Sequence, residues 1–450
     1  MRWSPLALVA LLPACPGDVP VATIGDPTSS SSSLASTDDD PSVSSAPPPA
    51  TFPTSTDPPV TTGDPDTTNS ETAQLPDTET ATSTSASTGP ADTTTADTTT
   101  GPADVCGPPC DELWFIEGDL VLSAPFDTAD LKCLGSVLGE LRITGDADAA
   151  ALAGLANLWF AGSVTIEFND VLTDLAPLAC LRSISFLTTF NTPALTSADL
   201  PALQTTQGVL FDGTALTAAP TFAPDITLGS VLFRNNPALV DLTGLAAYTG
   251  DDFTLVEIAS NPQLTSLAGL SDFLLSAADG YTQVRLIDLP QLGALPDLEV
   301  ATLGDLWLQD LPLLQDLDPL ASLTSVERLS LFDMPGVKDL HGLHNLATAS
   351  ELIIGDCVNQ QPNTPGMDAL VDLTGLDALT LAGSLILTNN KNLESLAGAP
   401  LLSEVYSLTA ITNPKLTQAD LDALIAQLDQ PPGQCLGDWN QCSCFNLMPW

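Results

Sequence analysis

The stretch LWLQDLPLLQDLDPLASLTSVERLSLFDMPGV, residues 306–337, decides the fold. Leu306 and Leu308 precede Leu311, and the same frame returns one repeat later, where it ends at Met334. We call the last position of this frame the corner, with apolar residues five and three positions before it. Spacing that repeats in this way predicts a structure built from stacked turns.

The frame recurs along most of the chain. Its corners fall at Asn169, Asn236, Asn261, Leu289, Leu311, Met334, Cys357 and Asn390, with weaker copies at Asn191, Gly213 and Asn413 and, at the start, Pro125 and Asp146. The near-constant period in the twenties predicts a solenoid of about thirteen turns, each with one short strand that stacks in parallel on the next. Residues five and three before each corner should face the core, and those four and two before it should face outward.

The corner residues predict a ladder. Asparagine is repeated there, and a stacked Asn side chain can bond the backbone of its own bend and of the neighbouring turn. The corners in the middle of the array are apolar and should point inward. Two longer repeats mark insertions near residues 274–282 and 359–372.

The first 105 residues differ from the rest of the chain in composition and lack the repeat. Residues 1–15, MRWSPLALVALLPAC, consist of one Arg, an apolar run and small residues, the pattern of a secretion signal. The segment before Cys15 resembles the lipobox of bacterial lipoproteins, which implies that Cys15 is lipidated. Residues 16–105 are rich in Ser, Thr, Pro and Asp and should form a disordered tether. Residues 106–450 then form the head.

Composition limits the partners. The chain has 10 Lys+Arg against 56 Asp+Glu. Nucleic acid is excluded as a partner because phosphate contacts need Lys and Arg, and membrane contact is expected through the lipid anchor alone. The charge permits metal ions, and calcium is the one that merits thought, although no calcium-binding motif is present. We therefore expect no cofactor.

The cysteines and the C-terminal segment predict end caps. Cys106 and Cys110 precede the first turn, Cys435, Cys442 and Cys444 follow the last, and Cys133 is close enough to pair with Cys106 or Cys110. Apolar spacing at Leu421, Leu424, Ile425 and Leu428 predicts a short capping helix.

The repeat resembles two related families. The form L-x-x-L-x-L-x-x-N-x-L is the leucine-rich repeat signature, and the form GDLVL, GELRI, GSVTIEFN is similar to the receptor L domain. Both resemblances imply a mainly β fold, here a right-handed parallel β-helix, and a recognition scaffold.

Catalytic chemistry is poorly supplied. The two histidines, His341 and His344, have no further ligand nearby in the sequence, and Asp316 and Asp318 fit solvated turn acids better than a glycosidase pair. The sequence has no nucleophile elbow, phosphate loop or zinc-protease motif. We therefore expect neither catalytic nor metal-ligating residues.

The outward column suggests a binding face. It gathers Arg234, Arg285, Trp307 and Phe332 near the middle of the array. Arginine and tryptophan among aliphatic residues are typical of interface hot spots. The sequence thus predicts a non-enzymatic protein, exported and anchored at the bacterial cell envelope or surface, that recognises an extracellular protein or glycan. The alternative is a β-helical carbohydrate-active enzyme.

Overall fold

The computed structural model describes residues 107–277, 281–355 and 366–437, all within one compact unit, 101–450. This part is mainly β and forms a parallel β-solenoid of about 12 turns. Residues 1–15, expected to be a secretion signal ending at Cys15, and residues 16–105, expected to form a tether, lie outside the described residues. So do Cys106, Cys357 and the last two cysteines.

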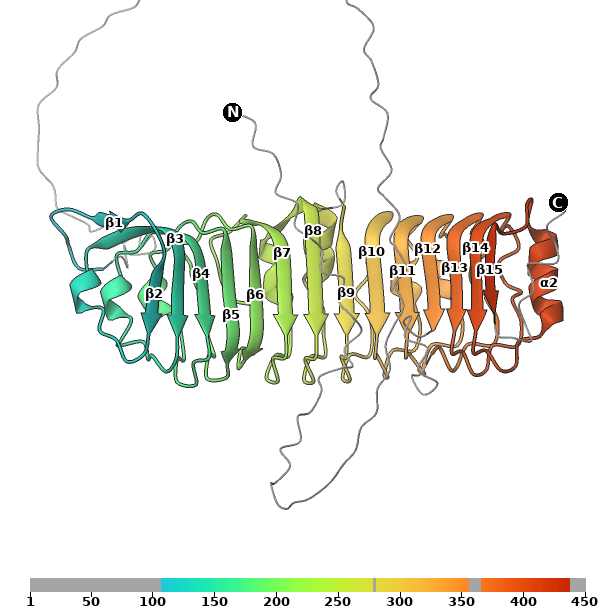
Figure 1. The fold of residues 1–450 in the computed structure, drawn as a ribbon, viewed down its shortest axis with the longest axis horizontal. Coiled ribbons are helices and arrows are strands. Elements are labelled where there is room, and N and C mark those ends of the chain that lie inside the picture. Colours follow the sequence, from blue (N-terminus) through green and yellow to red (C-terminus); the bar gives the residue numbers. More distant parts are fainter. Residues whose placement is uncertain (1–106, 278–280, 356–365, 438–450) are drawn as a thin grey trace, which may run out of the picture. The chain divides into compact units, whose positions relative to one another are not determined.

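All strands belong to one sheet and lie side by side in the order of the chain (Figure 1). Every strand pair in the described part of the sheet is parallel, and β2 pairs with β3 beside β1. The strands are β1 (Trp114–Ile116), β2 (Leu120–Ser123), β3 (Leu134–Thr144), β4 (Phe160–Glu167), β5 (Phe186–Thr192), β6 (Gly208–Thr214), β7 (Thr227–Arg234), β8 (Thr249–Ala259), β9 (Gln283–Ile287), β10 (Thr302–Gln309), β11 (Ser325–Phe332), β12 (Thr348–Gly355), β13 (Leu381–Thr388), β14 (Glu404–Ile411) and β15 (Gln434–Gly437).

The core follows the predicted frame. On β10, Leu306 and Leu308 are completely buried and lie opposite Leu329 and Leu331 of β11. Side chains alternate between the two faces of a strand, so each turn presents a pair of aliphatic residues to the core. Their stacking from turn to turn builds one continuous hydrophobic core, whose burial drives folding.

The residue just before each corner takes a left-handed conformation. Positive φ angles occur at Gly145, Phe168, Asn191, Gly213, Asn235, Ser260, Asp288, Asp310, Asp333, Asn389 and Thr412. This conformation turns the chain sharply at the end of each strand. Gly, Asn and Asp tolerate it best, which explains why they dominate the column.

The predicted asparagine ladder is confirmed. Asn236 and Asn261 are completely buried, and the Asn236 backbone N–H donates to Asn261 Oδ1 at 3.0 Å. The same contact joins Asn390 to Asn413, also at 3.0 Å. The apolar corners are confirmed too, since Leu311 and its counterparts Leu289 and Met334 are fully buried.

Two weaker corners were wrong by one position. The pairing of β5, β6 and β7 places Thr192 and Thr214, not Asn191 and Gly213, at the corner. A one-residue slip exchanges the two faces of a strand. Val209 and Phe211 therefore lie in the core instead of on the outer face. The frame failed here because threonine replaces asparagine: the Thr214 hydroxyl donates to Asn236 Oδ1 at 2.6 Å.

The returning side of each turn is built from short segments. They include the 3-10 helices η1 (Ala129–Leu131), η2 (Ala153–Leu155), η3 (Ala176–Leu178), η4 (Thr243–Ala247), η5 (Asp318–Leu320) and η6 (His341–Leu343). The insertion predicted near 274–282 overlaps the helix α1 (Leu270–Ser276), which packs against η4 and β8. Most of the second insertion lies outside the described residues.

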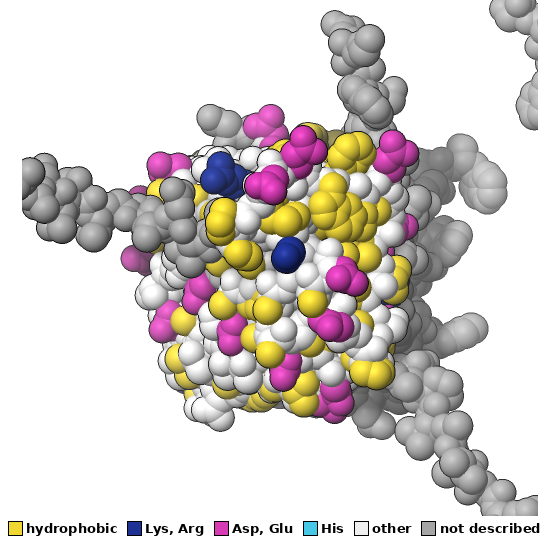
Figure 2. All heavy atoms as spheres, turned by 90° about the vertical axis from the view of Figure 1, so that its left-hand side faces the viewer, with side chains coloured by type: hydrophobic (Ala, Val, Ile, Leu, Met, Phe, Trp, Pro, Cys, Tyr) yellow, Lys and Arg dark blue, Asp and Glu magenta, His cyan; other side chains and the backbone are white. Residues whose placement is uncertain are grey.

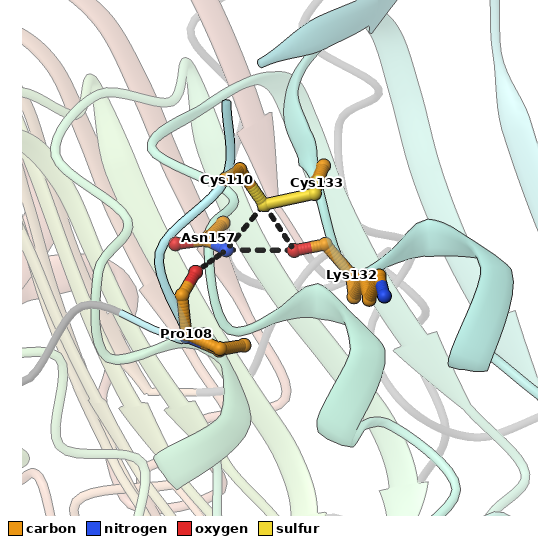
Figure 3. The surroundings of a disulfide bond; sticks show 5 residues. All are labelled: Pro108, Cys110, Lys132, Cys133 and Asn157. Atoms are coloured by element: carbon orange, nitrogen blue, oxygen red, sulfur yellow. Dashed lines mark hydrogen bonds between the residues drawn. A yellow bond between two sulfur atoms is a disulfide. The ribbon is translucent and has the colours of Figure 1, made fainter. Parts of the chain in front are cut away.

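A disulfide joins the first two turns. Of the two predicted partners of Cys133, the structure selects Cys110 (Figure 3). The Asn157 side chain donates to the carbonyl oxygens of Pro108 and Lys132 at 2.9 and 2.6 Å, and so ties the third turn to this bridge. Cys180 is also disulfide-bonded.

The predicted C-terminal helix is confirmed as α2 (Gln418–Gln427). A capping box formed by Thr417 and Asp420 begins it, and Leu421 and Leu424 are buried against the last turns. One further strand, β15, follows the helix and pairs with β14.

Candidate functional site

The four residues predicted to line a binding face all lie on the outer face of the sheet. Trp307 of β10 is the register partner of Arg285 on β9. The rings of Trp307 and Phe332 pack with centroids 4.9 Å apart. Arg234 lies on β7, three strands from Trp307. It is linked to Arg285 through ion pairs that both arginines form with Glu257. The structure therefore brings Arg285, Trp307 and Phe332 together and places Arg234 at the margin.

Six charged residues of alternating sign occupy six successive strands, β7 to β12. We call them the ion ladder; its members are Arg234, Glu257, Arg285, Asp305, Arg328 and Glu351. Ion pairs join the first four in order and the last two to each other, and Asp305 and Arg328 are register partners on β10 and β11. Arg234 Nε lies 2.6 Å from Glu257 Oε1, and Arg328 Nε lies 2.6 Å from Glu351 Oε2. Between these pairs, Arg285 contacts Glu257 at 4.0 Å and Asp305 at 3.3 Å.

Parallel stacking explains the alternation. Adjacent strands of a parallel sheet lie about 4.8 Å apart, so like charges on neighbouring strands would repel while opposite charges attract. The Arg residues on this face are therefore occupied by neighbouring carboxylates. As a result, the predicted hot spots Arg234 and Arg285 are not free cations.

Asp305 is the most enclosed member of the ladder. Its side chain is 4% exposed. Burial raises the pKa of its carboxyl group, while the charges of Arg285 and Arg328 act against that rise. Tyr281 lies near the Asp305 carboxyl group. The Tyr281 ring packs closely against Gly304, and a Cβ atom at that position would clash with the ring.

Three buried polar atoms at this place lack a hydrogen-bond partner in the described part of the chain. They are Arg285 Nε, Asp305 Oδ1 and Ser330 Oγ, which lie on the adjacent strands β9, β10 and β11. Ser330 is completely buried and is the register partner of Trp307. Buried polar groups are normally satisfied, so their concentration at one place marks a candidate binding site.

The aromatic pair differs in exposure. Phe332 is 3% exposed, whereas Trp307 is half-buried and donates from Nε1 to Gln309 Oε1 at 3.0 Å. Phe332 thus supports the indole, and Trp307 is the aromatic side chain of this pair that can meet a partner.

A second apolar surface lies at the N-terminal end of the solenoid. Figure 2 shows hydrophobic side chains gathered on this end. Among the residues of the first turns, Leu113, Trp114, Phe115, Leu138 and Trp159 are 41–56% exposed. The sequence frame missed this surface because most of these residues precede the first clear copy of the repeat.

The remaining candidate groups form no catalytic constellation. His344 Nδ1 lies 2.8 Å from the His341 carbonyl oxygen, and Asp316 Oδ1 accepts from the Asp318 backbone N–H at 3.3 Å. Among the described residues, no group of three or more His, Cys, Asp or Glu side chains is placed to hold a metal ion. The described helices include none with the length and apolarity needed to cross a membrane.

Comparison of the chain with protein-family models and with curated proteins finds no match. The structure itself therefore defines the class of protein: a parallel β-solenoid whose outer face carries an ion ladder beside an aromatic pair.

The prediction named two of the six members of the ladder, Arg234 and Arg285. Glu257 shares a column with Arg285, whereas Asp305, Arg328 and Glu351 lie in a separate column. The ladder runs diagonally, moving from two to four to six positions before the corner as it crosses from β7 to β10. Aligning the turns on the corner and comparing diagonals would have revealed its alternating charges.

Proposed function

We propose that this chain is a non-enzymatic recognition or adhesion protein that binds an extracellular protein or glycan through the outer face of its sheet. The observation that carries the proposal is the group of three buried, unpartnered polar atoms beside Trp307. A half-exposed indole next to polar groups with unused bonding capacity is suited to a specific contact.

The resemblance to leucine-rich repeats and receptor L domains supports the same proposal, because both are recognition scaffolds.

In this interpretation Cys15 is lipidated and residues 16–105 tether the head to the bacterial cell envelope or surface. The Cys15→Ser variant should move from the membrane fraction to the soluble fraction. If wild type and variant are both soluble, the anchor proposal is wrong.

The binding proposal is tested by capture experiments on the full chain. Wild-type protein, Trp307→Ala and the matched control Trp159→Ala are presented to a glycan array and to extracellular protein extracts. We expect Trp307→Ala to lose the bound ligand and Trp159→Ala, altered at the N-terminal end, to keep it. If Trp307→Ala still binds the ligand and Trp159→Ala does not, the binding site lies on the N-terminal surface instead. Release of reducing ends from polysaccharides would overturn the non-enzymatic assignment.

A further inference from the structure

The site around Trp307 also carries information about the chemistry of its ligand. Resting on the proposed recognition function, we infer that Arg285, Asp305, Trp307 and Ser330 form a subsite for a neutral saccharide. Hydroxyl groups of the saccharide would bond the polar atoms, and an apolar face of a sugar ring would lie against the indole.

The unused bonding capacity matches hydroxyl groups. Arg285 Nε can only donate, Asp305 Oδ1 accepts, and Ser330 Oγ can do both. A hydroxyl group both accepts and donates, so saccharide hydroxyls can accept from the guanidinium, donate to the carboxylate and bond the serine hydroxyl. Leaving such atoms buried without a partner destabilises the folded protein, and ligand binding would recover that loss.

The local charge favours an uncharged ligand. The ladder holds three arginines and three carboxylates in alternation. The positive charges of Arg285 and Arg328 already act on Asp305, which disfavours a cation there. An acidic saccharide would meet a head with nine bases and 42 acids in residues 106–450. A neutral sugar avoids both penalties.

The indole must move for the ligand to enter. All three polar atoms are shielded from solvent, and Trp307 lies between its register partners Arg285 and Ser330. Turning the indole breaks the hydrogen bond from Nε1 to Gln309. Sugar binding should therefore change the fluorescence of Trp307.

The experiment is a fluorescence and calorimetric titration of the full chain. The probes are neutral oligosaccharides of glucose, galactose and mannose, with oligogalacturonate as the acidic comparison. The variants are Ser330→Ala, Asp305→Asn and Trp307→Phe, and Trp159→Phe serves as the tryptophan control. We expect at least one neutral sugar to bind, with affinity weakened 10-fold or more in Ser330→Ala and Asp305→Asn. The fluorescence change should be lost in Trp307→Phe alone, and thermal unfolding should confirm that every variant is folded.

Several outcomes would overturn the inference. Binding of oligogalacturonate alone would refute the neutral class, and unchanged affinity in folded Ser330→Ala and Asp305→Asn would place the sugar elsewhere. If no sugar binds while capture of a protein depends on Trp307, the saccharide inference falls and the recognition function stands. If neither sugar nor protein depends on Trp307, both fall.

Discussion

Replacing Asn236 by leucine tests whether the asparagine ladder stabilises the solenoid. The Asn236 side chain is completely buried. Its Oδ1 accepts from the Thr214 backbone N–H at 3.0 Å and from the Thr214 hydroxyl at 2.6 Å, while Nδ2 donates to the Phe211 carbonyl at 3.0 Å. Leucine has the same number and branching of side-chain heavy atoms and is the native residue at corner 311, but it removes all three bonds.

The expected loss follows from those three bonds. The substitution leaves two donors and one acceptor of the preceding turn buried without partners, and each costs about 1–3 kcal/mol. Burial of a leucine side chain returns about 2 kcal/mol. The free energy of unfolding should therefore fall by about 1–7 kcal/mol.

The assay is urea unfolding monitored by circular dichroism, combined with hydrogen exchange of the Thr214 amide. Because neighbouring turns of a solenoid can unfold separately, exchange locates the effect in the affected turns. The control is Asn235→Gly, which alters an exposed residue and retains its positive φ angle. This control should change stability by less than about 0.5 kcal/mol. If Asn236→Leu is as stable as the control, side-chain bonding at the corner does not hold the turns together.

Three further predictions concern the turns. Burial, with a hydrogen bond to Asp310, raises the pKa of Asp333 to about 7; the folded state then binds a proton more readily than the unfolded chain, so stability should fall as pH rises from 4 through 7. Asp333→Asn should flatten this slope in urea midpoints measured between pH 4 and 8, and an unchanged slope would contradict the assignment. Reduction of the Cys110–Cys133 disulfide, which spans 23 residues, should lower the unfolding free energy of the first turns by about 3 kcal/mol. Amide hydrogen exchange should then become faster in the first turns. An equal change in exchange along the whole solenoid would contradict this prediction. Phe168→Asn should raise the urea midpoint, with a gain in the free energy of unfolding of no more than about 1 kcal/mol, because asparagine accepts the φ of 52° more easily while a ring contact with Phe190 is lost. A lower midpoint would show that the ring contact outweighs the strain.

The interior of the solenoid was predictable because each turn repeats the same local problem. A short strand must bury alternate residues and then bend, so aliphatic residues at Leu306 and Leu308 and a bonding side chain at Asn236 return at a fixed period. At Thr214 a different residue type satisfies the hydrogen bonds of the corner. The asparagine signal is then absent from the sequence, and the predicted corner is wrong by one position.

The candidate site was predictable only in part for a related reason. The period identifies which residues face outward, and it correctly placed Trp307 and Arg285 on one face. It carries no information about contacts between different columns, because those depend on side-chain length and direction across strands.

The sequence by itself determined the class of fold, the apolar frame, the asparagine corners and the C-terminal helix, since all of these follow from hydrophobic burial and backbone bonding within a turn or between adjacent turns. Only the tertiary structure decided that Cys133 bonds Cys110, that Arg234 and Arg285 are neutralised by Glu257 and Asp305, and that Phe332 supports Trp307 from below the surface. These facts depend on the stacking register, which brings residues some 20 to 28 positions apart to within hydrogen-bonding distance.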